Sequence, residues 1–67
     1  MPGEIFEVGE RVHYVPAVGS PENGIVKSVH PGGRTCAVVY KCNGDWANYQ
    51  NYTGCSTLVI DLRKGWV

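Results

Sequence analysis

The sequence predicts an all-β fold, a small antiparallel barrel of four or five strands with one short helical turn in a long connection. Apolar residues occur in short segments, and some of these alternate with polar residues as in half-buried strands. Turn-forming clusters of Gly, Pro and Asn separate the segments at intervals of about 8–15 residues, which is typical of small barrels. The 67 residues are expected to form a single domain, 1–67, with a modest core.

The first strand is expected at residues 11–15, after a turn at Gly9. Side chains alternate between the two faces of a strand, so Val12 and Tyr14 should share one face. Pro16 then ends the ladder because it has no backbone N–H to donate.

The next two strands form the most regular hairpin in the sequence. They are expected at residues 24–29 and 35–40, joined by a tight reversal at 30–34. Asn23-Gly24 predicts a turn ahead of the second strand, since both residues tolerate positive φ. On the third strand, Val38 and Tyr40 should point inward together.

Residues 41–56 form a connection that is long for so short a chain. Connections beyond about 12–15 residues in a compact domain are usually functional or disordered. The aromatic rings of Trp46, Tyr49 and Tyr52 argue against disorder. Asp45 is expected to N-cap a helical turn that begins at Trp46, which would put the three rings nearly on one stripe.

The remainder of the chain is expected to close the barrel. Residues 57–60 should form a fourth strand and residues 61–65 a 3₁₀-like turn, followed by a short closing strand at residues 66–67.

Four short motifs in this order resemble the SH3-like barrels of the Tudor, agenet and KOW type. They are Val-Gly-Glu-x-Val, Gly-x-Val-x-x-Val, Val-x-Tyr and Asp-Leu, and together they span residues 6–62. The resemblance implies that the first motif opens the barrel and that Asp-Leu lies near the closing turn.

A second resemblance extends over nearly the whole chain. The segments Gly-Glu-Arg-Val-His-Tyr-Val-Pro, Glu-Asn-Gly-Ile-Val-Lys, Val-Val-Tyr-Lys-Cys-Asn-Gly-Asp-Trp-Ala-Asn-Tyr-Gln-Asn-Tyr-Thr and Asp-Leu-Arg-Lys-Gly-Trp look like a group of small, mostly uncharacterised proteins of bacteriophages and prophage-bearing bacteria. This resemblance implies a phage or mobile-element accessory protein that acts in a bacterial cytoplasm.

The charge balance argues against a strongly electrostatic DNA binder. Six Lys and Arg offset six Asp and Glu, and non-specific binding to nucleic acid depends mainly on basic groups that displace counterions. Lys27, Arg34, Lys41, Arg63 and Lys64 form either a solvated face or a patch. Convergence of the last three beside Trp46 would suit a phosphate and base, or an acidic partner surface.

The three cysteines suggest a reducing compartment and no metal site. Cys36, Cys42 and Cys55 cannot all pair, and neither a signal peptide nor an apolar run of roughly 18–20 residues is apparent. Zinc ligands usually include a tight Cys or His pair, and none exists here. We expect buried free thiols, a cytoplasmic protein, no metal and no membrane partner.

No catalytic motif stands out, so we expect a protein that is not an enzyme. The residue types for two chemistries are present: a cysteine with a histidine base (Cys42 or Cys55 with His13 or His30), and paired carboxylates (Asp45 with Asp61 or Glu22). There is no nucleophile elbow, metal-binding His-Glu-x-x-His, P-loop or dinucleotide motif. A small enzyme that builds its site from several copies stays as an alternative.

The leading functional hypothesis is a binding module that engages a protein partner through a Tyr/Trp-rich surface, without a cofactor. The candidate binding residues are Trp46, Tyr49, Tyr52, Tyr14, Lys41 and Arg63. Alternatives are a host-defence antagonist, which inhibits a nuclease or sequesters a nucleotide, and a binder of nucleic acid. A homo-oligomer is expected because so small a barrel has surplus apolar surface. The competing interpretation is that the rings only fill and close the barrel.

Overall fold

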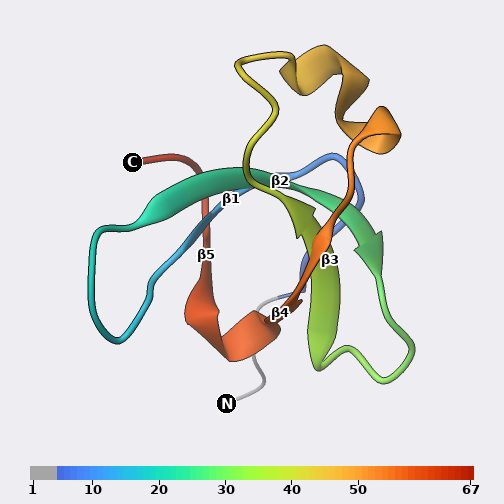
Figure 1. Ribbon diagram of the computed structural model, residues 1–67. Helices are drawn as coiled ribbons and strands as arrows, with labels where there is room; N and C mark the ends of the chain where they lie inside the picture. The colour runs from blue at the N-terminus through green and yellow to red at the C-terminus, as the bar shows by residue number, and fades with distance from the viewer. Residues whose placement is uncertain (1–4) are drawn as a thin grey trace.

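The structure, a computed structural model, describes residues 5–67 as five antiparallel strands in one sheet (Figure 1). The strands are β1 (Arg11–Tyr14), β2 (Glu22–Val29), β3 (Thr35–Val39), β4 (Cys55–Leu58) and β5 (Leu62–Lys64), in the spatial order β4-β3-β2-β1-β5. Two 3₁₀ helices, η1 (Trp46–Asn51) and η2 (Val59–Asp61), lie before and after β4. The predicted fold class is confirmed: a small all-β, barrel-like fold with a helical turn in its long connection. Residues 1–4, on which the expectation about a signal peptide partly depends, lie outside the described residues.

The core follows from strand alternation. Inward-facing residues of β1, β2, β3 and β5 meet Phe6 in one cluster, whose other members are Val12, Val26, Cys36, Val38 and Leu62. Tyr14 and Tyr40 pack against this cluster and remain half-buried. The predicted inward faces of the first and third strands are therefore confirmed.

The turn predicted at Asn23-Gly24 is wrong, although Gly24 lies in the second strand as predicted. The residue lies within β2, directly opposite Val12 in β1, and its φ is not positive. A Cβ at this position would lie 2.6 Å from Val38 Cγ1 and 2.9 Å from the carbonyl oxygen of Val39. Glycine is therefore required here by the close approach of β3. β2 begins two residues before the predicted start, at Glu22.

A β-bulge at Lys27 gives the long connection a place to attach. The β2–β3 register shifts between Val26 and Ser28, which leaves Lys27 as the extra residue. Gln50 in η1 donates to the carbonyl oxygen of Lys27 at 3.2 Å, and the Lys27 ammonium donates to the carbonyl oxygen of Tyr52. The bulge thus fixes η1 against the outer side of β2.

The last part of the chain differs from the prediction in register. The fourth strand is Cys55–Leu58, the 3₁₀ turn is Val59–Asp61, and the closing strand is Leu62–Lys64. The strand begins at Leu62 because this residue pairs with Tyr14 and is buried in the core. The predicted closing strand at residues 66–67 is absent from the sheet of the described chain. Trp66 instead donates its indole N–H to the carbonyl oxygen of Gly24 at 2.8 Å.

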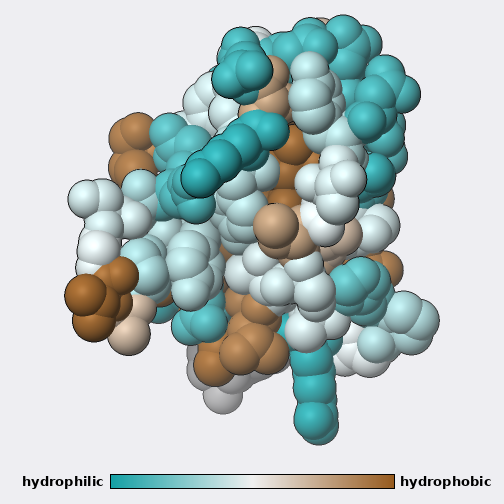
Figure 2. Space-filling model, in the orientation of Figure 1, coloured by the Kyte–Doolittle hydropathy of each residue, from teal (hydrophilic) through white to brown (hydrophobic). Residues whose placement is uncertain are grey.

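Exposed apolar residues are scattered on the face that Figure 2 shows. Val18 lies in the loop between β1 and β2, Ile60 lies on η2, and Val67 lies beyond β5, with exposures of 90%, 75% and 72%. Polar surface separates the brown areas in Figure 2, so this face has no single large apolar patch. Within residues 5–67, no helix has the length and apolar character required to cross a membrane.

Candidate functional site

The ends of the strands gather polar and aromatic side chains at one end of the sheet. Neighbouring strands are antiparallel, so β1 and β3 finish where β2, β4 and β5 begin. Five residues lie at these strand ends: Tyr14, Glu22, Tyr40, Cys55 and Asp61. They line one open pocket of ≈ 400 Å³ together with Ser56, Thr57 and Leu58 of β4. We call this site the tyrosine pocket. Its volume is within the range of small-ligand sites.

Two tyrosine rings form the aromatic part of the pocket. Tyr14 and Tyr40 meet edge to face, with ring centroids 6.1 Å apart and planes inclined by 64°. The Tyr40 hydroxyl hydrogen-bonds to the Thr57 hydroxyl at 2.8 Å, which fixes the ring against β4. Thr57 in turn donates to the carbonyl oxygen of Cys55 at 3.2 Å. The rings are therefore held in place while both stay partly exposed.

Two acidic residues lie beside Tyr14 in the sheet, one on either side. Glu22 is its direct partner in β2, and Asp61 accepts the N–H of Val15 through its carbonyl oxygen at 2.9 Å. Within residues 5–67, neither carboxylate forms an ion pair or accepts a side-chain hydrogen bond. Each is half-buried. The pocket therefore carries negative charge that nothing in the described chain neutralises.

The environment keeps Tyr40 in its neutral form. Burial raises the pKa of Tyr40 above its usual value, the nearby Cys55, Glu22 and Tyr14 raise it further, and the hydrogen bond to Thr57 partly offsets these effects. A neutral phenol ring offers its π face to a cation without adding a second ionisation to the site.

The combination of rings and carboxylates suits a cationic group. A lysine or arginine head near an aromatic face gains about 0.5–2 kcal/mol from the ring quadrupole. Carboxylates add charge-assisted hydrogen bonds, which are about twice as strong as neutral ones. An anionic group would meet two like charges in the same space. The chemistry that this pocket supports is the non-covalent capture of a basic side chain.

A second aromatic site lies on the outer side of β1 and β2. Trp46 of η1 packs on Trp66 with ring centroids 4.9 Å apart and planes inclined by 51°. The Arg11 guanidinium lies over the Trp66 ring, 4.6 Å from its centroid. We call these three residues the tryptophan stack. Since the rings cover each other and the arginine already covers one of them, less of each face is left for a ligand.

The predicted stripe of three rings in the long connection does not form one surface. Asn48 breaks the helical geometry of η1, and the rings have separate partners. The Tyr49 hydroxyl lies against Gly9, where a Cβ would be 3.1 Å away, and the Tyr52 hydroxyl donates to Asp45 at 2.9 Å. The hydrogen bond to Asp45 raises the pKa of Tyr52. All three rings are half-buried, as the interpretation of the connection as a lid expects.

Asp45 precedes η1 as predicted but does not cap it. Its side chain forms no hydrogen bond to the helix N-terminus. The two carboxylate oxygens instead accept hydrogen bonds from the Asn48 side chain and the Tyr52 hydroxyl, each at 2.9 Å. Asp45 therefore ties the two ends of the turn together.

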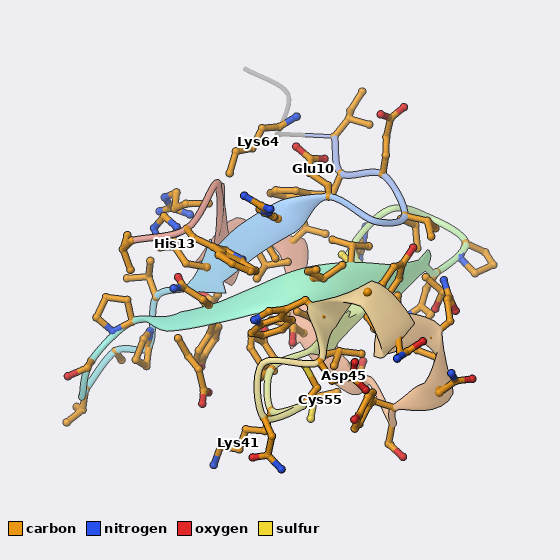
Figure 3. The ribbon with its side chains drawn as sticks, turned by 90° about the horizontal axis from the view of Figure 1, so that it is seen from above. Glu10, His13, Lys41, Asp45, Cys55 and Lys64 are labelled. Carbon is orange, nitrogen blue, oxygen red and sulfur yellow. The ribbon has the colours of Figure 1, made fainter. Side chains whose placement is uncertain are left out.

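The basic residues predicted for the site do not converge. Arg63 donates to the carbonyl oxygens of Ile60 and Leu62, both at 2.9 Å. Lys41 is exposed just beyond β3, and Figure 3 shows it on the side opposite Lys64, which pairs with Glu10 at 3.2 Å. A single patch formed by Lys41 and Lys64 is therefore ruled out.

The thiols differ in exposure. Cys36 and Cys42 are buried as predicted, whereas Cys55 is exposed at the rim of the tyrosine pocket. Burial raises the pKa of Cys36, which makes this thiol a poor nucleophile. Among residues 5–67 no group of three or more His, Cys, Asp and Glu side chains is arranged to hold a metal ion.

Sequence reasoning found Tyr14 but missed its neighbours in the pocket. Tyr40 was assigned to the core, and Glu22 and Asp61 were considered only as partners of Asp45. Their common position at strand ends was the signal that could have united them. This signal identifies the pocket residues only once the pairing of the strands is known.

Comparisons with known proteins add no relative to this description. No family model matches the chain, and neither a curated protein nor a solved structure matches it significantly. The functional argument therefore depends on the site alone.

Proposed function

We propose that this chain is a binding module that engages a protein partner by capturing a lysine or arginine side chain in the tyrosine pocket. The observation that carries the proposal is that Glu22 and Asp61, which have no charged partner within residues 5–67, line the same pocket as Tyr14 and Tyr40. The resemblance to small phage proteins supports a partner from the bacterial host or from the phage. An inhibitor of a host-defence effector would be one case of such a module.

A second candidate function uses the outer face of β1, opposite the face that carries Tyr14. Arg11 and His13 share this outer face, and Arg63 of β5 lies directly opposite His13. Arg11 and Arg63 provide cations and Trp66 provides a ring, the combination that binds a phosphate and a base. This favours nucleic-acid binding as the alternative. Binding of single-stranded DNA should then fall steeply as salt rises, and a flat response would contradict it.

The primary proposal is tested with a ligand that has a cationic head and almost no backbone. Saturation-transfer difference NMR with N-acetyl-arginine amide measures binding to the native chain, with N-acetyl-glutamine amide as the neutral control. We expect the arginine compound to bind and Tyr14→Ala to weaken it by about fivefold or more, because one cation–π face is lost. Asp61→Asn should weaken it about two- to fivefold through the lost charge.

The matched control is Trp46→Ala, which removes a ring from the tryptophan stack and leaves the tyrosine pocket intact. This variant should bind N-acetyl-arginine amide as the native chain does. Equal binding of the arginine and glutamine compounds, or binding lost in Trp46→Ala and kept in Tyr14→Ala, would contradict the proposal.

A further inference from the structure

The two edges of the sheet are protected very differently. β5 is three residues long and carries two exposed charges, Arg63 and Lys64, which discourage pairing with another strand. β4 has the sequence Cys-Ser-Thr-Leu, with neither a charged residue nor proline. Within residues 5–67, β3 is its only neighbour in the sheet. The β4 edge therefore lacks the devices that usually keep an edge strand unpaired.

The β3–β4 ladder determines which backbone groups of β4 face outward. The N–H of Val59 bonds to the carbonyl oxygen of Arg34 at 2.9 Å, and this pair continues the β3–β4 register. Bonded and non-bonded pairs alternate along an antiparallel ladder, so Thr57 bonds to β3 and Ser56 does not. The N–H and C=O of Ser56 and the N–H of Leu58 therefore point away from β3, at the free edge.

This edge is also a wall of the tyrosine pocket. All four residues of β4 line it, together with Glu22 and Asp61. Cys55 and Thr57 pair with buried residues of β3 and so lie on the inner face, whereas Ser56 lies on the outer face. Free backbone donors and acceptors thus stand next to a negatively charged, aromatic pocket.

We propose that the β4 edge pairs with an extended segment of the partner protein, and that this segment inserts a lysine or arginine side chain into the tyrosine pocket. The inference rests on the proposed function and adds the mode of binding. A segment residue opposite Ser56 forms both backbone hydrogen bonds and keeps its side chain outside. The adjacent residue then points to the inner face, level with Cys55 or Thr57, and its cation reaches the carboxylates.

The test uses a short peptide that alternates Thr and Val around one central Arg, with an acetylated and an amidated end. Its affinity for the native chain is compared with its affinity for Ser56→Pro and Ser56→Ala. Proline removes the outward N–H and is tolerated on strand edges, while alanine keeps the backbone. We expect Ser56→Pro to weaken the peptide about tenfold or more and Ser56→Ala to change it less than about twofold.

A ligand-side arm keeps the test decisive if Ser56→Pro fails to fold. One of the two residues beside the central Arg lies opposite Ser56, so its N-methylation removes the N–H that donates to the Ser56 carbonyl oxygen, whereas N-methylation of the Arg itself removes an N–H that points away. Binding to the native chain should fall about tenfold or more for at least one of the two neighbours and about twofold or less for the Arg itself. Equal effects at all three positions would overturn the proposal.

Two further measurements distinguish the edge proposal from the proposed function on which it rests, and from pairing of the β4 edge with a second copy of this chain. N-acetyl-arginine amide cannot form the strand ladder, so it should bind the native chain whether or not the β4 edge pairs with the peptide. If the arginine compound binds but the peptide binds the native chain and Ser56→Pro equally, the edge proposal fails and the proposed function stands. Sedimentation of the native chain detects the rival: a dimer that Ser56→Pro dissociates would assign the edge to a second copy and overturn the peptide proposal. A native monomer agrees with it.

Discussion

The tyrosine pocket and the tryptophan stack are both built from half-buried aromatic rings, but they differ in whether their polar and charged groups have partners within the described chain. In the stack, the Trp66 indole donates to Gly24 and the Arg11 cation lies over the ring, so the available interactions are made within the chain. In the pocket, the carboxylates of Glu22 and Asp61 have no charged partner within residues 5–67. The number of aromatic rings does not distinguish the two sites. What distinguishes them is whether the neighbouring charged groups have partners within the described chain.

Gly24 connects the two regions. Its carbonyl oxygen accepts the Trp66 indole N–H. A Cβ added to its α-carbon would lie 2.9 Å from Tyr40 Cδ1. One residue of β2 therefore has the stack on one side and a ring of the pocket on the other. A change at this residue should affect both regions, and changes farther out should affect one.

The largest effect is expected for Gly24→Ala, which should break both regions together. The new methyl group would overlap Val38 and the β3 backbone, and overpacking of this kind costs about 1–3 kcal/mol or more. Urea unfolding should show this loss, and binding of N-acetyl-arginine amide should weaken as Tyr40 moves. Ser28→Ala, an exposed change in the same strand, is the control and should stay within about 0.5 kcal/mol. Native-like stability of Gly24→Ala would contradict the close packing described here.

Trp66→Phe should affect the stack alone. It removes the indole hydrogen bond to Gly24, worth about 1 kcal/mol, and weakens the contact with Trp46, worth about 0.5–1.5 kcal/mol. We expect unfolding free energy to fall by about 1–2 kcal/mol while N-acetyl-arginine amide binds as before. A matching loss of binding would mean that the two regions are coupled beyond Gly24.

Tyr40→Phe is the corresponding change in the pocket. It removes the hydrogen bond to Thr57 and keeps the ring, so stability should fall by about 0.5–1.5 kcal/mol. Binding of the arginine compound should weaken less than it does in Tyr14→Ala, since the π face remains. Urea unfolding and saturation-transfer NMR on the same samples give both values. A variant more stable than the native chain would contradict the role given to this hydrogen bond.

Alkaline pH should destabilise the protein through three groups. The folded state raises the pKa of Cys36 above 9.0 and those of Tyr40 and Tyr52 above 10.0, so it holds these protons more tightly than the unfolded chain does. Their stabilising contribution is complete below those values and is lost as pH rises through the folded pKa values. Urea unfolding should show falling stability above about pH 9. Tyr40→Phe should make the fall shallower, and an identical profile would contradict the assignment to Tyr40.

The smallest effect is a difference in labelling rate that reports on the pocket. Cys55 is exposed at the pocket rim, whereas Cys36 and Cys42 are buried. Iodoacetamide should therefore modify Cys55 first, and the arginine peptide should slow this reaction. Mass spectrometry of timed samples identifies the labelled thiol. A control peptide with Glu in place of the central Arg should not slow the labelling of Cys55. Equal slowing by both peptides would show that the cationic side chain is not responsible.

The strands that sequence reasoning located best are those with an alternating pattern. Val12 and Tyr14 in β1 and Val38 in β3 follow this pattern, and their inward faces are as predicted. Gly24 was misread because the local sequence suggests a turn, while the need for glycine comes from β3, a distant segment. Leu62 was assigned to a turn because its strand has only three residues, too few to show alternation.

The pocket was harder to predict than the fold because its residues come from five different strand ends. Tyr14 was identified from its ring alone. Glu22 and Asp61 lie far apart in the sequence, and only the order of the strands brings them to the same end. The long connection drew attention because of its aromatic residues, but the Lys27 bulge and the tryptophan stack anchor it to the barrel. Local composition therefore identified ring-rich segments and not the unpaired charges.

The most direct test of the central claim is a ¹H–¹⁵N NMR titration of the native chain with the arginine-centred peptide. If the tyrosine pocket is the binding site, the amide signals of Tyr14, Ser56 and Thr57 will shift in a saturable manner. The indole signals of Trp46 and Trp66 will then stay where they are. Saturable shifts confined to the two indoles, with the pocket amides unchanged, would place binding at the tryptophan stack and contradict the account.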